Sequence, residues 1–419
     1  MDVSSSAPTR RTRLLSDPDV FRYVAARIVS LTGSAVTFIA MPVLIYGITG
    51  SATWTSLVIV AEAVPYLVFG LWAGALADHV DRRRVMVGAD VLAALALATV
   101  PVAYWLDVLT AAHVLIAAFG VRTIFVFFDA ANQGALPSLV GRDRLPAANA
   151  LVFGGSTVAE TVVPMAAGAL IVVVSPASII AVDVLTFVAS AMLIRSITRP
   201  LSGARDRVNP LRLTAVADGT RFILRHPIVR VMIVIGILVA FSAGALMAIL
   251  VVWADRTLGV QEGDWRLGML FGAWGVGGVI GSVLVPRLMH RFGGVRAALV
   301  TLPFAAATGV ALAMAESWVA GALAIVAWSV AYVLIATVSV TLRQQVTPEP
   351  LMSRVMTAGR MVTFGLGYPV GALVAGALAG VMETDEALLL SQLSLAVAAM
   401  IAWSSSLRHA PRRLEVAED

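Results

Sequence analysis

The chain has 419 residues, of which 59% are hydrophobic and only 13% are charged. Soluble domains carry about 25% charged residues, so this composition excludes an ordinary soluble protein and indicates a polytopic helical membrane protein. All 30 basic residues are arginine, which excludes an ATP-binding P-loop because that loop needs a lysine. There is no cysteine, and the five histidines lack ligand spacing. We therefore expect neither a metal nor another cofactor.

Long apolar stretches recur along the whole chain and predict twelve membrane-spanning helices. The expected spans are 23–46, 54–77, 85–106, 109–132, 147–174, 176–197, 229–253, 267–289, 296–314, 317–342, 354–381 and 386–407. They divide the chain into an N-terminal tail (1–22), a first six-helix half (23–197), a linker (198–228), a second six-helix half (229–407) and a C-terminal tail (408–419). The fold class expected is an all-α membrane protein.

The distribution of arginine predicts how the chain is oriented. The two tails and the loops after even-numbered spans are rich in arginine, whereas the opposite loops hold only Arg256 and Arg266. Because positive loops stay in the cytoplasm, both termini are expected there. The net charge of +5 follows from this topology, so we expect the lipid bilayer as a partner and no nucleic acid.

A short basic loop occurs twice, about half a chain apart, and each copy joins two apolar spans. The first copy runs from Gly74 to Arg84 and the second from Pro286 to Arg296. Pro137 and Pro348, near the fifth span of each half, repeat at nearly the same offset. A half-length repeat in a hydrophobic chain is typical of transporters built from two parallel repeats.

Twelve spans in two sets of six, with the sequence Gly-Ala-Leu-Ala-Asp from Gly74 to Asp78 and arginines at 82–84, resemble the major facilitator superfamily over essentially the whole chain. Within it, the chain resembles the drug–proton antiporter-like group that includes macrolide and siderophore exporters. The residues that carry this narrower resemblance are 78–84, Leu136-Pro137, Ala148-Asn149, Asp183, Thr347-Pro348 and Arg354. The resemblance implies alternating access between two six-helix halves in a bacterial plasma membrane.

The chain also departs from the pattern of that group. His79 and Asp81 stand where the group has a basic residue and a glycine. Of the antiporter signature in the fifth span, Pro164 and Gly168 remain, whereas alanine or valine replaces other glycines. These departures leave facilitated diffusion open as an alternative to antiport.

The first basic loop supplies the candidate gating residues Gly74, Asp78, Arg82, Arg83 and Arg84. Gly74 lets two helices approach closely, and Asp78 can accept hydrogen bonds from a helix N-terminus. The resemblance implies that this N-terminus is the start of the eleventh span. We expect the three arginines to pair with acids at neighbouring helix ends, although arginines there can also serve topology alone.

Ionisable side chains inside a span are costly, so each is a functional hypothesis. They are Arg27, Glu62, Asp90, Arg122, Asp129, Glu160 and Asp183 in the first half and Arg360 in the second. The candidates for proton coupling are Glu160, Glu62, Arg122 and Asp129, with a static ion pair or a polar pocket wall as the alternative. We expect Asp129 to meet the arginines of the basic loop. Arg27, Asp90 and Asp183, nearer the span ends, are expected to be structural.

Aromatic side chains in the middle of spans are candidates for a substrate pocket, although each could instead face lipid. They are Phe125, Phe128, Phe241, Trp274, Trp328 and Tyr332. Glycines cluster in the eighth and eleventh spans, which predicts close helix packing there.

We expect a monomeric secondary transporter that exports small hydrophobic molecules, drugs or a secreted metabolite, in exchange for protons. The first alternative is a lipid or siderophore transporter on the same fold, and another is a sensor that transports nothing. An enzyme is not expected, because no catalytic constellation is found in the sequence.

Overall fold

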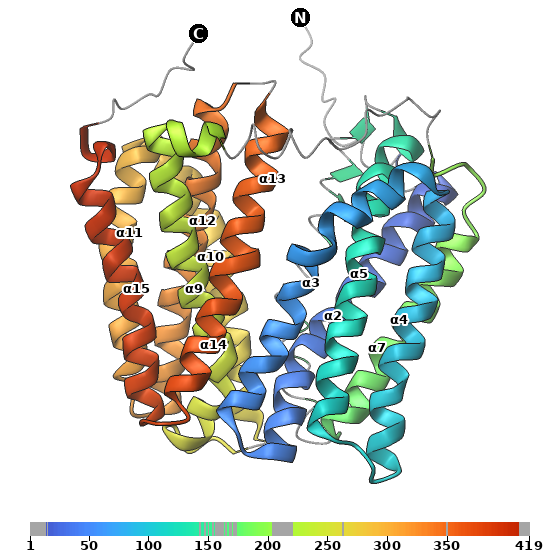
Figure 1. The fold of residues 1–419 in the computed structure, drawn as a ribbon, viewed down its shortest axis with the longest axis horizontal. Coiled ribbons are helices and arrows are strands. Elements are labelled where there is room, and N and C mark those ends of the chain that lie inside the picture. The colour runs from blue at the N-terminus through green and yellow to red at the C-terminus, as the bar shows by residue number, and fades with distance from the viewer. Residues whose placement is uncertain are drawn as a thin grey trace, which may run out of the picture. The chain divides into compact units, whose positions relative to one another are not determined.

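A computed structural model describes residues 14, 16–141, 144–145, 148–149, 151–152, 155, 163, 166, 170, 174–202, 221–261, 264–348 and 351–409. All the elements in these residues are helices (Figure 1). Eleven of them are long and apolar enough to cross a membrane, which confirms the predicted fold class. Most of the expected span 147–174 and most of the linker 198–228 lie outside the described residues.

The helices of the first half follow the predicted spans closely. They are α2 (Pro18–Thr49), α3 (Ala52–His79), α4 (Arg82–Trp105), α5 (Ala111–Val140) and α7 (Pro176–Arg195). Side chains before three of them accept hydrogen bonds from backbone N–H groups of the first turn, and these capping residues are Asp81, Thr110 and Ser175. Such caps allow short connections between helices. For example, two residues separate α3 from α4.

The helices of the second half are α9 (Pro227–Arg256), α10 (Trp265–Phe292), α11 (Gly294–Ala313), α12 (Trp318–Val346), α13 (Met352–Val362), η3 (Thr363–Gly367), α14 (Tyr368–Leu378), α15 (Thr384–Ser404) and η4 (Ser406–His409). Asp264 caps α10, and its hydrogen bond from Arg266 holds the pKa of this carboxyl below its ordinary value. The eleventh span is not one regular helix. It consists of α13 and α14 joined by the π-helix η3, an interruption that is frequent at functional sites and that its sequence did not predict.

Two compact units make up the chain, and they do not coincide with the two halves. Unit 1 lies within residues 1–41, 68–167 and 174–210, and unit 2 within 42–67, 168–173 and 211–419. Helices α2 and α3 belong to both units, and Pro42 and Pro65 lie at or near the two crossings. A proline inside a helix removes one backbone hydrogen bond and kinks it, so both helices are weakened near the boundary.

Unit 1 is organised around α4, which packs against α5 and α7. Tyr23, Met86 and Phe128 belong to a hydrophobic cluster that draws side chains from α2, α4, α5 and α7. On the outside of the same helices, large apolar side chains such as Ile116 and Leu185 are exposed. This is the pattern of a membrane protein, in which lipid replaces water around the apolar surface.

Helix α9 forms the centre of unit 2 and packs against α12, α14 and α15. Every residue from 242 to 254 is buried, as expected of a helix surrounded on all sides. Glycines permit this packing: a Cβ atom on Gly244 would lie 1.9 Å from the carbonyl oxygen of Tyr368, and one on Gly371 would lie 2.0 Å from that of Phe241. The glycines of the eleventh span thus serve close packing, as their clustering predicted.

Replacement of Gly371 by alanine should destabilise unit 2, because the added methyl group collides with the backbone of α9 and forces the helices apart. Overpacking of this kind costs about 1–3 kcal/mol. We expect a lower thermal unfolding midpoint for purified Gly371→Ala protein in detergent. The matched control is Gly278→Ala, whose new methyl group would have its nearest neighbour at 4.0 Å. Equal midpoints for the two variants would contradict this account of the glycines.

Candidate functional site

One end of unit 1 carries most of its charged contacts, and we call it the arginine-rich end. There the N-terminal ends of α2 and α4 meet the C-terminal ends of α5 and α7. Arg22 of α2 donates a hydrogen bond to the carbonyl of Ser196, which follows α7, at 3.0 Å. The first basic loop lies at this end, between α3 and α4.

Arg82, the first residue of α4, lies against α5. Its Nη1 donates to the carbonyl oxygen of Gly134 at 2.9 Å and to Oγ of Ser138 at 3.1 Å. Gly134 makes room for the guanidinium, since a Cβ atom there would lie 2.3 Å from Cζ of Arg82. Arg82 therefore joins the first basic loop to the last turns of α5.

The neighbouring arginines have different roles. Arg83 donates from Nη2 to the carbonyl of Arg199, and Arg84 takes part in the cap of α4 through its backbone N–H, which donates to Asp81. Of the described residues, carbonyl and hydroxyl groups are the partners of Arg82 and Arg83. The expected pairing of these arginines with acids stays a prediction, because acids such as Asp78 and Asp143 lie outside the described side chains.

Gly74 and Asp78 lie on α3, but the structure does not describe the surroundings of Gly74 or the side chain of Asp78. Their proposed gating roles remain predictions. The second basic loop lies between α10 and α11, where Arg287 donates to the carbonyl of Val283 and Arg291 lies over the ring of Phe292 at 5.4 Å. Of the described arginines, those of the first copy donate hydrogen bonds to other segments, whereas Arg287 and Arg291 contact residues of their own helix.

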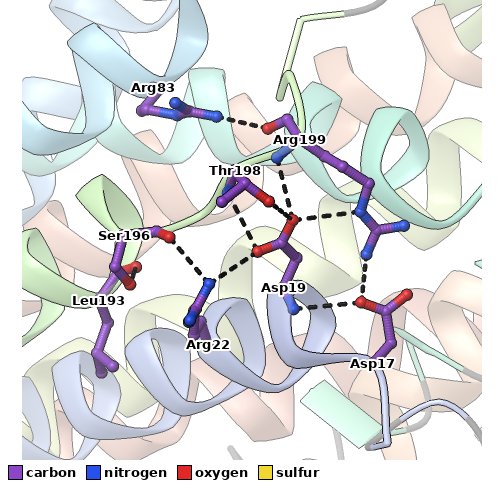
Figure 2. A network of polar contacts seen from close by, with 8 residues as sticks. All are labelled: Asp17, Asp19, Arg22, Arg83, Leu193, Ser196, Thr198 and Arg199. Atoms are coloured by element: carbon purple, nitrogen blue, oxygen red, sulfur yellow. Dashed lines mark hydrogen bonds and ion pairs between the residues drawn. The ribbon is translucent and has the colours of Figure 1, made fainter.

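Asp19 is the centre of a network that the sequence analysis missed (Figure 2). Its carboxylate accepts hydrogen bonds from the backbone N–H and Oγ1 of Thr198, from the backbone N–H and Nε of Arg199, and from Nη1 of Arg22. Asp17 also pairs with Arg199. The network joins the start of α2 to the segment that follows α7. Its signal in the sequence is weak, because two acids in a basic tail can equally be solvated.

The structure describes three of the four proton-coupling candidates. Glu160 lies outside the described residues, and Glu62 is half-buried on α3. Arg122 lies over the ring of Phe125 at 5.0 Å. Asp129 accepts a hydrogen bond from Gln133 at 3.3 Å, and Arg82 turns to Gly134 and Ser138 instead, so the expected meeting of Asp129 with the basic loop is wrong.

Arg27, Asp90 and Asp183, which were expected to be structural, are deeply buried charges in the predicted spans of unit 1. Asp183 and Asp90 are 1% and 2% exposed, and Arg27 is 6% exposed. Arg27 lies with its Cζ 5.0 Å from the centre of the Phe128 ring. Phe128 is itself buried in the hydrophobic cluster of unit 1, so in this structure it is a core residue rather than part of a pocket wall.

Three of the substrate-pocket candidates meet in unit 2. The ring centres of Trp274 and Trp328 are 5.0 Å apart, those of Trp328 and Tyr332 are 5.3 Å apart, and those of Trp274 and Tyr332 are 5.8 Å apart. Trp328 and Tyr332 are one helical turn apart on α12, whereas Trp274 comes from α10. We call these three residues the aromatic cluster.

A buried polar group supports the aromatic cluster from α15. Oε1 of Gln392 accepts hydrogen bonds from Nε1 of Trp328 at 2.8 Å and from Oγ of Ser242 at 2.5 Å. A lone glutamine in an apolar span was the sequence signal for this site, because such a group must find partners inside the protein. The remaining candidates lie elsewhere: Phe125 stacks on Phe128 at 6.2 Å, and Phe241 faces Gly371 with its carbonyl.

Polar contacts also hold residues 42–67 within unit 2. The hydroxyl of Tyr46 donates to Asp255 at 2.6 Å. Arg256 donates to the carbonyl of Gly50 at 3.1 Å and to that of Ala379 at 3.2 Å. The turn between α2 and α3 is thereby bound to the ends of α9 and α14.

Buried charges in one half, an aromatic cluster in the other and close-packed glycines are features of a helical secondary transporter. A match to the family described as "Transmembrane secretion effector" covers residues 14–417. The chain belongs to this family, which is part of the major facilitator superfamily. The predicted resemblance is confirmed.

Among characterised relatives, the chain is 28% identical to the multidrug efflux pump Tap of Mycolicibacterium fortuitum, with 88% of this chain and 91% of that protein covered. It is 31% identical to macrolide efflux protein A of Streptococcus pyogenes over 45% of this chain and 46% of that protein. The identity with the enterobactin exporter EntS of Salmonella typhi is 24%, with 88% of both chains covered.

Solved structures show the same fold. The nucleoside transporter NupG has a TM-score of 0.76 at 9% identity, with 94% of this chain and 100% of that chain covered. A bacterial homologue of the human lysosomal transporter Spinster has a TM-score of 0.73 at 15% identity, with 99% and 100% covered.

Replacement of Gly134 by alanine should displace Arg82 from α5 and remove its two hydrogen bonds, at a cost of about 1–3 kcal/mol. Arg82→Ala removes the same contact, so the double variant should be no less stable than the worse single variant. Thermal unfolding of the purified proteins measures both effects. Gly120→Ala on the same helix is the control, because nothing lies within 4 Å of its new Cβ atom. Additive losses would show that Gly134 and Arg82 act independently.

Replacement of Asp19 by asparagine should destabilise the arginine-rich end, because the amide cannot pair with Arg22 and Arg199 and presents hydrogen-bond donors to their donors. Hydrogen bonds to charged groups contribute about 1.5–3 kcal/mol each, so we expect a lower unfolding midpoint. Glu386→Gln, an exposed acid in the first turn of α15, serves as the control. If both variants unfold at the wild-type temperature, the network does not support the fold.

Proposed function

We propose that this chain exports small lipophilic molecules across a bacterial plasma membrane in exchange for protons. The arginine-rich end faces the cytoplasm in this proposal, since positively charged loops remain there. The two halves expose a central site alternately to either side, as in other transporters built from two parallel repeats.

The observation that carries the proposal is the likeness to the efflux pump Tap along nearly the full length of both proteins. A likeness of this extent supports export, whereas fold alone would not specify it. The aromatic cluster adds a surface suited to such cargo, because indole and phenol rings bind flat apolar molecules and cations.

Within the aromatic cluster, the residues differ in what they can contact. Trp274 and Tyr332 are half-buried, whereas Trp328 is buried and held by Gln392. We infer that Trp274 and Tyr332 form the binding surface and that Trp328 fixes their orientation. Rigid aromatic groups bind with little loss of conformational entropy, which suits a site that takes several different molecules.

Export of a siderophore is the second candidate, and the likeness to the enterobactin exporter EntS favours it. A siderophore is larger and more polar than a lipophilic drug, so the two substrate classes can be separated experimentally.

Efflux of a panel of lipophilic dyes and antibiotics from cells that produce the protein, with and without a protonophore, tests the proposal. We expect efflux of at least one dye that stops when the protonophore collapses the proton gradient. Efflux that continues without a gradient would contradict proton coupling. Export of a catecholate siderophore together with failure to export every dye would favour the second candidate.

Trp274→Ala should weaken binding of a transported dye such as ethidium, because it removes one wall of the aromatic cluster. Aromatic pairs contribute about 0.5–1.5 kcal/mol, so we expect KM to rise by roughly 2- to 13-fold with little change in expression. The control is Trp105→Ala, an exposed tryptophan at the end of α4. Unchanged KM for Trp274→Ala would remove this cluster from the substrate site.

A further inference from the structure

Three charged side chains from three helices gather inside unit 1: Arg27 of α2, Asp90 of α4 and Asp183 of α7. Asp90 lies within electrostatic range of both Arg27 and Asp183, and all three are more than nine-tenths buried. We call them the charge triad. Arg27 and Asp90 are nine and eight residues into their helices, so both lie about 12–14 Å from the arginine-rich end.

Asp183 has partners for both carboxylate oxygens. Oγ1 of Thr37 donates to Oδ2 at 2.6 Å, and Oγ1 of Thr186 donates to Oδ1 at 2.7 Å. Gly33 leaves the space for this arrangement, because a Cβ atom there would lie 2.1 Å from Oδ1 of Asp183. Hydroxyl donors on both oxygens favour the ionised form of the Asp183 carboxylate.

Asp90 is in the opposite situation. Within the described part of the chain, its Oδ2 has no hydrogen-bond partner, and neither have Nε and Nη1 of Arg27. The guanidinium lies over the Phe128 ring instead of forming an ion pair with Asp90. A buried carboxylate with one unpartnered oxygen lies within electrostatic range of a buried guanidinium with unused donors, and a fixed structural ion pair would not leave such an arrangement incomplete.

The net charge of the charge triad indicates what completes this arrangement. With both acids ionised, the charge triad carries one net negative charge in a region that solvates charge poorly, and one proton brings it to zero. Asp183 is stabilised as the anion by its two hydroxyl donors, so the proton belongs on Asp90. A metal cation suits the site less well, because Arg27 repels it and few oxygen ligands are close.

We propose that Asp90 is the proton-carrying carboxylate of this transporter and that Arg27 is its movable counter-charge. The inference rests on the proposed proton-driven function. When Asp90 holds a proton, Arg27 stays on Phe128. When the proton leaves, the carboxylate attracts the free Nε–H and Nη1–H groups of Arg27, and this movement draws α2 towards α4.

The described titratable and charged groups around the triad come from α2, α5 and α7. From α7, Asp183 and the hydroxyl of Ser190 face Asp90, and from α2 Arg27 faces it. Tyr23 of α2 lies within electrostatic range of Arg27 and of Asp129 of α5. Glu62 and Arg122, the other candidates for this role, are half-buried, whereas Asp90 is buried.

Infrared titration of the purified protein in liposomes tests the site without any substrate. We expect a component of the carboxylic-acid C=O band that gains intensity as pH falls, that is absent in Asp90→Asn and that persists in Asp183→Asn but appears there at lower pH, because one negative charge of the triad has been removed. Asp90→Glu keeps a carboxyl group, so it should retain a shifted band and shows that the pocket still folds. Loss of the band in Asp183→Asn instead, or an unchanged band in Asp90→Asn, would overturn the assignment. A band that responds to sodium concentration rather than to pH would also overturn it.

Transport of ethidium separates failure of this inference from failure of the proposed function. In wild-type vesicles an imposed pH gradient should drive ethidium uphill. Asp90→Asn should lose at least nine-tenths of this uphill movement yet keep downhill exchange and stabilisation by ethidium. If wild type shows gradient-driven transport and Asp90→Asn does too, the inference alone fails. If wild-type transport ignores the gradient, the proposed function fails and the inference fails with it.

Discussion

The bilayer interior offers no hydrogen-bond partners, so every polar group placed there must be satisfied by the protein itself. This constraint explains why the described polar side chains inside the helices gather in a few clusters. Gln392 accepts hydrogen bonds from Trp328 and Ser242, and both carboxylate oxygens of Asp183 accept hydrogen bonds from threonines. Arg27 and Asp90 are among the described residues with buried polar atoms that lack a partner, and in our proposal a proton completes their site.

The same constraint shapes helix packing. Helices in lipid gain little from the hydrophobic effect, so they rely on close van der Waals contact, and glycine allows it. Gly244 and Gly371 bring α9 and α14 together backbone to backbone, and Gly134 brings Arg82 onto α5. Charges are concentrated in unit 1 and the aromatic cluster in unit 2. In the proposed mechanism, unit 1 handles the protons and unit 2 contacts the apolar cargo.

Most of the fold could be predicted from the sequence because span length and arginine distribution are local signals. The ends of the helices were harder, since α5 continues to Val140 and the eleventh span contains a π-turn. The site was harder still. Trp328 and Tyr332 share a face by their spacing, but the approach of Trp274 from α10 depends on how two helices pack. The sequence identifies each member of the charge triad as an ionisable residue inside a span. It does not show that the three lie together, because they come from three helices far apart in sequence. The hydrogen bonds of Arg82 to Gly134 and of Arg83 to Arg199 depend on how α4 packs against α5 and the segment after α7, which no motif reveals.

The most direct test of the account is to record proton movement and dye movement together in vesicles that contain only this protein. A pH-sensitive dye trapped inside would report protons while ethidium fluorescence reports the substrate. We expect ethidium added on one side, with no initial pH gradient, to drive protons in the opposite direction in a fixed ratio. Ethidium that crosses at the same rate without any proton movement would contradict proton exchange, and the charge triad would then need another explanation.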